Sequence, residues 1–290
     1  MSKETEHFIK KIEIKNYKLF KDFKAEGFGR VNLIGGKNNV GKTAFMEACY
    51  LSSDKEKNLE HILRTRYAID ILGDLWKDIG KQYVENYIKE KSKDYKNSKI
   101  ITNLKDKQIN MHFKSINKTT KYHFNTLYDL IIKSELEDKL DKYINKFDTS
   151  IEKFRIINNQ PFCKKNNNFY NLNEFGDGLN KYISLVVILL SQTNQIIFID
   201  EIENGIHYTN FDKLWEIILT ISKEQNIQVF ATTHSKECID SFARVAKKLE
   251  DKEITYTQLK RMVDNSIKAG VYDSDTLINA IEQEHEVRGW

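Results

Sequence analysis

Residues 30–43 read RVNLIGGKNNVGKT and contain the pattern that most strongly indicates the fold. Residues 30–34 form a short run rich in β-formers that stops at two glycines, and residues 43–51 read as a helix. Residues 36–43 fit the pattern G-x-x-x-x-G-K-[ST]. A strand, a glycine-rich turn and a helix in this order make half of a βαβ unit, so the stretch predicts an α/β fold.

The glycine-rich loop is expected to bind the phosphates of ATP. Its backbone N–H groups can point inward at a phosphate, and the following helix offers its positive end. Lys42 would supply a charge to the β- and γ-phosphates, and Thr43 a hydroxyl ligand for Mg²⁺. A chance match is the alternative, and the position of the loop between a strand and a helix argues against it. The expected contacts are Gly36, Asn38, Asn39, Val40, Gly41, Lys42, Thr43 and Ala44.

A second motif, IIFIDE, spans residues 196–201 and places two carboxylates after a buried strand. Asp200 stands where a carboxylate would hold Mg²⁺, and Glu201 could orient and deprotonate the attacking water. Phosphoryl transfer needs positioning and charge neutralisation more than covalent chemistry, so these few groups suffice. Many strands end in an acidic residue, so the motif gains weight only from its place behind the phosphate loop and ahead of a further motif.

Two more segments complete the series. Residues 175–181 read FGDGLNK and come just before a predicted helix over 178–191. Residues 231–235 read ATTHS and follow the next buried strand, at 227–232. Taken alone, Gly-Asp-Gly is also an ordinary turn at a helix start, and a single histidine such as His234 is more often structural.

In this order the motifs resemble the ABC-like AAA ATPases of the OLD, RecF and SMC superfamily. The resemblance rests on IDEIENGIHY at 199–208, on ATTHS, and on the run from residue 12 to residue 43. It covers about residues 8–52 and 172–240. It implies a P-loop NTPase of ABC-ATPase type, with a mostly parallel sheet, flanking helices, an antiparallel β lobe and a helical insertion.

The resemblance also implies roles for single residues. Lys42 and Thr43 would bind phosphates and magnesium, Asp200 the metal, and Glu201 would be the catalytic base. His234 would sense the γ-phosphate. The helix start at Gly176, Asp177 and Gly178 would be a signature sequence that faces the γ-phosphate bound by an opposing subunit, although transporters have Ser-Gly-Gly there.

Two further positions stay open. Lys18 stands where some relatives place an arginine near the γ-phosphate. Gln160 is a candidate for the Q-loop glutamine, and equally a loop residue before Pro161.

The chain is expected to form one domain, residues 1–290, with its core in 1–55 and 159–250. Between them lies a mixed insertion, 56–158, and after them a C-terminal extension, 251–290. Within the insertion we expect a helix over 56–95, short strands at 99–102, 109–113 and 122–124, and a helix over 127–147. The second core segment should add a strand at 195–199 and helices at 211–223 and 236–249.

Composition narrows the function. No run of about 18 apolar residues exists and the first seven residues are polar, so a cytoplasmic protein without membrane contact is expected. The three cysteines (Cys49, Cys163 and Cys238) lie far apart with no CxxC, which indicates reduced thiols. With 46 Lys and Arg against 42 Asp and Glu, the net charge of +4 is well short of a dedicated nucleic-acid binder.

Two functions remain. In the first, the protein forms a homodimer or higher homo-oligomer around ATP and controls a separate protein effector, a nuclease or toxin, in anti-phage defence, like the ATPases of PARIS-, Septu- or Gabija-type systems. In the second, it is a RecF- or SMC-like DNA-binding ATPase in DNA repair or maintenance. A fused Toprim nuclease is not expected, because only 56 residues follow His234. Asp273-Ser-Asp275 resembles part of the acidic signature of that domain, and for the same reason it is interpreted as a solvated turn before a helix.

Overall fold

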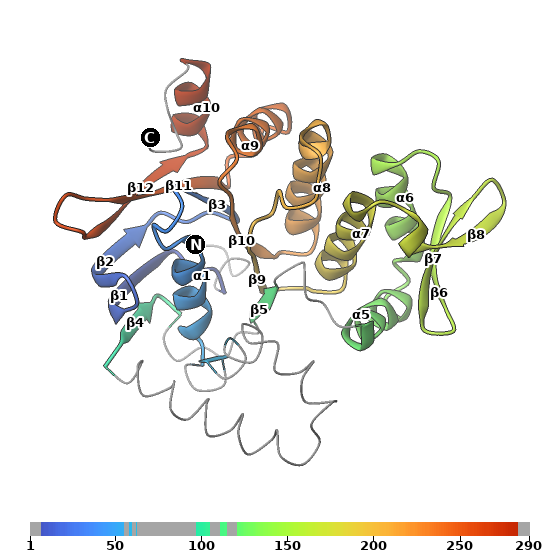
Figure 1. The fold of residues 1–290 in the computed structure, drawn as a ribbon, viewed down its shortest axis with the longest axis horizontal. Coiled ribbons are helices and arrows are strands. Elements are labelled where there is room, and N and C mark those ends of the chain that lie inside the picture. Colours follow the sequence, from blue (N-terminus) through green and yellow to red (C-terminus); the bar gives the residue numbers. More distant parts are fainter. Residues whose placement is uncertain are drawn as a thin grey trace, which may run out of the picture.

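The computed structural model describes residues 7–54, 58–59, 62, 97–104, 111–114 and 121–283. A six-stranded sheet forms its centre (Figure 1), and all neighbouring strands in it are parallel except for the terminal β11–β12 pair. The strand order is β12 (Ile267–Asp273), β11 (Ile254–Arg261), β3 (Val31–Gly35), β10 (Gln228–Thr232), β9 (Ile196–Ile199) and β5 (Met111–Lys114).

Helices cover both faces of this sheet. Strands β3, β9 and β10 are buried throughout, as expected for parallel strands packed on both sides. Ile197 and Val229 join one core cluster with α7, α8 and α9, while Phe198 and Phe230 join another with α1. The helices are α1 (Lys42–Leu51), α7 (Asp177–Leu190), α8 (Phe211–Glu224) and α9 (Lys236–Lys248). These four helices, and the strands predicted for the two core segments, begin and end within one residue of their predicted bounds.

A separate antiparallel sheet packs beside α1 and confirms the predicted β lobe. It has the order β2 (Phe20–Glu26), β1 (Lys11–Tyr17) and β4 (Lys99–Thr102). Phe23 on β2 meets Phe45 on α1 with ring centroids 5.8 Å apart. The fold class predicted from the sequence is therefore confirmed, with a mostly parallel sheet, flanking helices and an antiparallel lobe.

A third unit lies beyond α7 at the right of Figure 1. It consists of two helices, α5 (Lys121–Lys133) and α6 (Glu137–Phe147), and a small antiparallel sheet. The sheet comprises β6 (Lys153–Ile157), β7 (Gln160–Lys165) and β8 (Asn168–Asn171). Two short 3-10 helices, η3 (Leu172–Glu174) and η4 (Tyr208–Asn210), precede α7 and α8, and α10 (Ser274–Glu282) follows β12.

Two local predictions are wrong in this unit. The strand predicted at 122–124 is the first turn of α5, because Phe124 is buried together with Leu127, Tyr128 and Ile131 at helical spacing. The single helix predicted over 127–147 is broken into two. Glu135 adopts a left-handed conformation, with φ 57°, and its N–H and that of Leu136 close the end of α5, which is a Schellman ending.

The central sheet extends beyond the expected core ranges 1–55 and 159–250. Strand β5 lies within the predicted insertion yet pairs with β9, and β11 lies within the predicted C-terminal extension yet pairs with β3. Most of the helix predicted over 56–95 lies outside the described residues. Asp273 caps α10 by accepting a 2.8 Å hydrogen bond from the N–H of Thr276, as expected for a turn before a helix.

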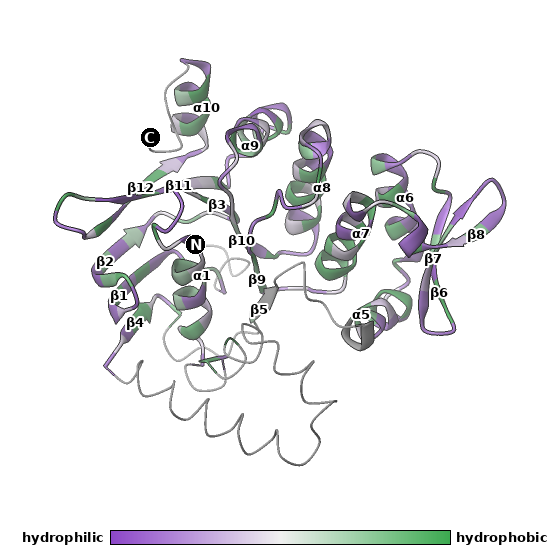
Figure 2. Ribbon diagram, in the orientation of Figure 1, coloured by the Kyte–Doolittle hydropathy of each residue, from purple (hydrophilic) through white to green (hydrophobic). Residues whose placement is uncertain are grey.

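Hydropathy follows this layering. The helices around the sheet carry both apolar and polar residues (Figure 2), the pattern of helices that pack one side against a core. Within the described part of the chain, no helix combines the length and the apolar character needed to cross a membrane.

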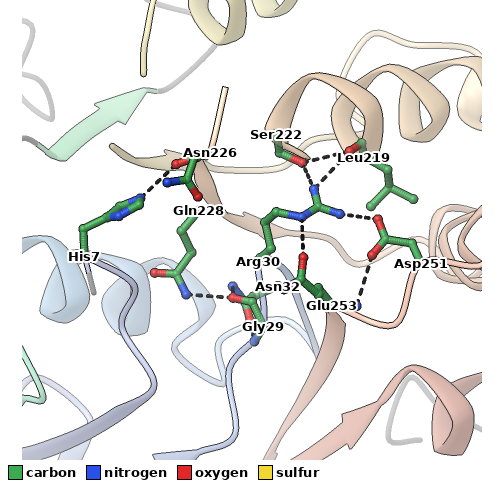
Figure 3. A network of polar contacts seen from close by, with 10 residues as sticks. All are labelled: His7, Gly29, Arg30, Asn32, Leu219, Ser222, Asn226, Gln228, Asp251 and Glu253. Carbon is green, nitrogen blue, oxygen red and sulfur yellow. Dashed lines mark hydrogen bonds and ion pairs between the residues drawn. The ribbon is translucent and has the colours of Figure 1, made fainter. Parts of the chain in front are cut away.

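A buried arginine, Arg30, connects the last strands with the core at the N-terminal ends of the parallel strands. Figure 3 shows its contacts. The guanidinium of Arg30 forms an ion pair with Asp251 and donates to the hydroxyl of Ser222 and, at 3.0 Å, to the carbonyl of Leu219. It also reaches Glu253 at 3.2 Å. The side chains of Arg30 and Asp251 are only 3% and 9% exposed. Arg30 therefore connects β3 with α8 and with the segment that leads into β11.

Arg30→Met is expected to destabilise the fold by about 3–5 kcal/mol, because it leaves a buried carboxylate without its partner. Urea unfolding would measure the loss. The matched control is Arg244→Met, which breaks the exposed pair with Asp212 and should cost less than about 1 kcal/mol. Equal midpoints for the two variants would contradict the proposed role of Arg30.

Candidate active site

Three of the four sequence motifs, at 36–43, 196–201 and 231–235, meet in one cavity of about 750 Å³ at the C-terminal ends of β3, β9 and β10. Ligands of parallel α/β sheets bind at this edge. The described residues that line the cavity are Leu19, Asn38, Asn39, Gly41, Lys42, Thr43, Ala44, Asp200, Glu201, Thr232, His234 and Arg261.

The loop between β3 and α1 owes its shape to residues with positive φ. Gly36 has φ 140°, and a Cβ there would lie 2.5 Å from the carbonyl oxygen of Leu259. Gly41 has φ 96° and directly precedes α1 without a side chain to cap it. The first residues of α1, Lys42 to Ala44, line the cavity, and the N–H groups at the start of a helix can bind an anion. Val40 is buried rather than part of the cavity lining.

The side chain of Lys42 folds back over this loop. Its Nζ donates to the carbonyl oxygens of Gly36 and Lys37 at 2.8 and 3.0 Å. Burial lowers the pKa of Lys42, and the nearby carboxylates of Glu203, Asp200 and Glu201 counteract that shift. The ammonium group is thus partly desolvated beside the cavity, where a phosphate would be a stronger partner than two carbonyls.

Asp200 joins two neighbouring elements through hydroxyl groups. The hydroxyl of Thr43 donates to its carboxylate at 3.0 and 3.2 Å, and the hydroxyl of Thr232 donates to it at 2.6 Å. Carboxylate and hydroxyl oxygens are suitable ligands for Mg²⁺, which typically takes one or two carboxylates and completes its shell with water and phosphate oxygens. The pair Thr43 and Asp200 fits such an ion, and no cluster of three or more His, Cys, Asp or Glu ligands occurs among the described residues.

Glu201 is held at the cavity by its backbone and its side chain. It adopts φ 50°, a left-handed conformation that is uncommon for a residue with a side chain. Its N–H donates to the hydroxyl of Thr232, and its Oε2 accepts from the side-chain amide of Asn204, both at 2.8 Å. A carboxylate in this setting is oriented, exposed to the cavity and able to accept a proton from water.

His234 lines the same cavity and is tied to Glu203. The Nδ1 atom of His234 lies 2.9 Å from Oε1 of Glu203. No role for Glu203 follows from the sequence alone, although the run Asp-Glu-Ile-Glu at 200–203 contains it. Thr232 and Arg261, which line the cavity, are not predicted from the sequence either. The guanidinium of Arg261 donates to the carbonyl of Asn39 at 2.9 Å.

The expected signature residues lie elsewhere. Gly176 precedes α7 with an extended backbone and no side chain to cap it, and a Cβ at Gly176 would meet no atom within 4 Å. None of Gly176, Asp177 and Gly178 is among the described residues that line the cavity. Within one copy of the chain, the expected signature residues are therefore separate from the cavity that contains the phosphate loop, Asp200, Glu201 and His234.

The two open positions also lie outside the described cavity lining. Lys18 forms an ion pair with the buried carboxylate of Glu47 on α1. Gln160 starts β7, and its side-chain oxygen accepts from the amide of Asn171 at 3.1 Å. The structure thus gives Gln160 a partner within the small sheet of the third unit.

Comparison with known proteins gives matches along nearly the whole chain. Residues 8–183 match the family model described as AAA ATPase domain. The chain is also similar to an ATP/GTP phosphatase of Helicobacter pylori. The identity is 23% over an alignment that is 372 positions long, gaps included, and that covers 97% of this chain and 100% of that protein.

Solved structures with a similar fold include heads of SMC proteins. One is an SMC head bound to the C-terminal winged-helix domain of ScpA, with a TM-score of 0.59, 11% identity, and coverage of 95% of this chain and 99% of that one. The SMC head of Thermotoga maritima gives a TM-score of 0.52 at 11% identity, over 91% and 98% of the two chains. An SMC head of Pyrococcus furiosus, bound to the C-terminal domain of ScpA, gives 0.52 and 11% over 96% and 99%. At this identity the likeness shows the fold alone.

Proposed function

Because the chain belongs to the family of AAA ATPase domains and is an ATPase with an ABC-like fold, we propose that two copies close around ATP and thereby control a separate protein. The observation that carries this proposal is the uncapped start of α7. This helix start does not line the cavity of its own copy of the chain, and no side chain caps it. The N–H groups of its first turn could therefore bind the phosphate of an ATP molecule held by another copy.

In this proposal the loop from Gly36 to Ala44 binds the phosphates of ATP, with Lys42 as its charged contact. Thr43 and Asp200 would hold Mg²⁺. Their hydroxyl and carboxylate oxygens are the kind of ligand that this ion prefers, and they lie 3.0 Å apart. When bound, the ion neutralises charge on the phosphates. The protein residues bind and orient the γ-phosphate between Lys42 and His234.

Glu201 is the general base in this proposal. Its carboxylate lines the cavity and is oriented by Asn204, so that a water between it and the γ-phosphate can lose a proton to it. His234 contacts the γ-phosphate and so distinguishes ATP from ADP. Gly176, Asp177 and Gly178 of the second copy complete the site.

The target of the switch is proposed to be a protein, a nuclease or toxin acting in anti-phage defence. An ATP-driven change does work only on a molecule that binds the two states differently. The net charge of +4 favours a protein over DNA, whose binding depends on concentrated Lys and Arg. Two of the similar SMC heads are bound to domains of ScpA, which are protein partners of those proteins.

Light scattering tests the closure directly. The Glu201→Gln protein should double its mass in Mg-ATP and return to its starting mass in ADP. Gly176→Glu in the same background should stay at the starting mass, because its carboxylate would repel the γ-phosphate of the other copy. Gly176→Ser is the matched control, since both side chains extend into open space. A mass that ATP leaves unchanged would contradict the proposal.

Capture from the native host identifies the target. Glu201→Gln in ATP should retain a protein that Lys42→Ala does not, and phage protection should require Lys42. Protection that persists in Lys42→Ala, or tight and salt-sensitive DNA binding without a protein partner, would favour the RecF-like DNA-binding function instead.

A further inference from the structure

We propose that Glu203 is a positioning residue for His234, and that ATP hydrolysis depends on the contact between them. The inference rests on the proposed function, since it assigns His234 to the γ-phosphate. Glu203 does not line the cavity, so it would act through the imidazole and not on the nucleotide itself.

One carboxylate oxygen holds both the backbone and the ring of His234. Oε1 of Glu203 accepts a 2.8 Å hydrogen bond from the backbone N–H of His234 and lies 2.9 Å from Nδ1. The side chain of Glu203 is only 8% exposed, whereas that of His234 is 53% exposed and lines the cavity. The imidazole is therefore held from its buried side and exposed on the side of the cavity.

This contact decides which ring nitrogen faces the nucleotide. A carboxylate accepts hydrogen bonds, so Nδ1 of His234 must carry a proton to bind Oε1. Nε2 is then the nitrogen left for the cavity. A carboxylate that orients a histidine from behind is a recurrent way of fixing both its tautomer and its direction.

The other oxygen of Glu203 shows that packing alone does not explain this residue. Oε2 is buried and has no hydrogen-bond partner among the described residues, which is costly for a carboxylate. Among the carboxylates that counteract the lowering of the Lys42 pKa by burial, Glu203 has the largest effect. Only one oxygen of this buried carboxylate has a hydrogen-bond partner among the described residues. Its presence beside the phosphate loop is therefore better explained by a role in the site than by a contribution to the stability of the fold.

Two substitutions separate the contact from the charge. Glu203→Leu removes the acceptor, so the ring loses its fixed orientation. Glu203→Gln keeps an oxygen at the same place, because the backbone N–H of His234 donates to that atom and an amide oxygen can serve it equally. The Gln variant should therefore retain the tautomer that the Leu variant loses.

The experiment measures ATP turnover and ATP affinity in wild type, Glu203→Leu, Glu203→Gln, His234→Ala and the Glu203→Leu/His234→Ala double variant. We expect His234→Ala to lower kcat by about 10²-fold and Glu203→Leu by at least about 10-fold. Glu203→Gln should stay within about 3-fold of wild type. In all four variants ATP affinity should change less than kcat, because the phosphate loop is intact.

The double variant decides whether Glu203 acts through His234. If it does, adding Glu203→Leu to His234→Ala lowers kcat no further, since the residue to be positioned is gone. Multiplying effects in the double variant, or a Glu203→Leu protein with wild-type kcat but a lower melting temperature, would overturn the inference and leave the proposed function standing. Wild-type kcat in His234→Ala would instead remove the proposed role of His234, and the inference with it.

Discussion

Lys42→Ala should abolish measurable binding of ATP and ADP. The ammonium group of Lys42 is partly buried beside the cavity and donates hydrogen bonds to the loop carbonyls of Gly36 and Lys37. Hydrogen bonds to charged groups contribute about 1.5–3 kcal/mol each. Loss of two of them to phosphate oxygens would weaken binding by about 10²-fold or more.

Isothermal titration calorimetry checks this expectation. Lys37→Ala is the matched control, because Lys37 belongs to the same loop but is exposed and outside the cavity lining. Its affinity for ATP should stay within about 3-fold of wild type, a change of less than about 1 kcal/mol. If Lys42→Ala bound ATP as well as Lys37→Ala does, the loop would not be the phosphate site.

Glu201→Gln should keep ATP bound while its turnover falls by about 10²–10⁴-fold. The amide retains the shape of the side chain and its hydrogen bond with Asn204, yet it cannot take a proton from water. The dissociation constant for ATP should therefore remain close to wild type, and the loss should appear in kcat.

Single-turnover hydrolysis and equilibrium binding separate the two quantities. Glu250→Gln, an exposed carboxylate outside the cavity lining, should hydrolyse ATP at the wild-type rate. Wild-type turnover in Glu201→Gln would mean that another group takes the proton, and the assignment of Glu201 as the base would be wrong.

The parts of the site that follow from local sequence could be predicted. The phosphate loop needs glycine where φ is positive, at Gly36 and Gly41, and the acids at Asp200 and Glu201 follow directly from the end of a buried strand. Glu203 and Arg261 could not be assigned, because their roles depend on contacts with His234 and Asn39, 31 and 222 positions away in the chain.

Errors in the fold have a similar origin. Tyr122-His-Phe124 alternates like a strand, but three residues fit a helix just as well, and burial of the residues after them decides in favour of α5. The eight residues of β11 are buried at six successive positions and show no alternation. Whether such a run becomes a strand, and beside which partner, is set by the surrounding structure more than by its own preference.

The pairing of β3 with β11 has a consequence for the synthesis of the protein on the ribosome. Strand β3 lies between β10 and β11, and Val31 stands opposite Ile254 in the pairing with β11. The loop after β3 rests against the carbonyl of Leu259. Synthesis proceeds from the N-terminus, so the complete GKNNVGKT sequence emerges more than 200 residues before its supporting strand. A nascent chain therefore carries the nucleotide motif through the synthesis of more than 200 further residues before β11, which pairs with β3 and contacts the loop, is available.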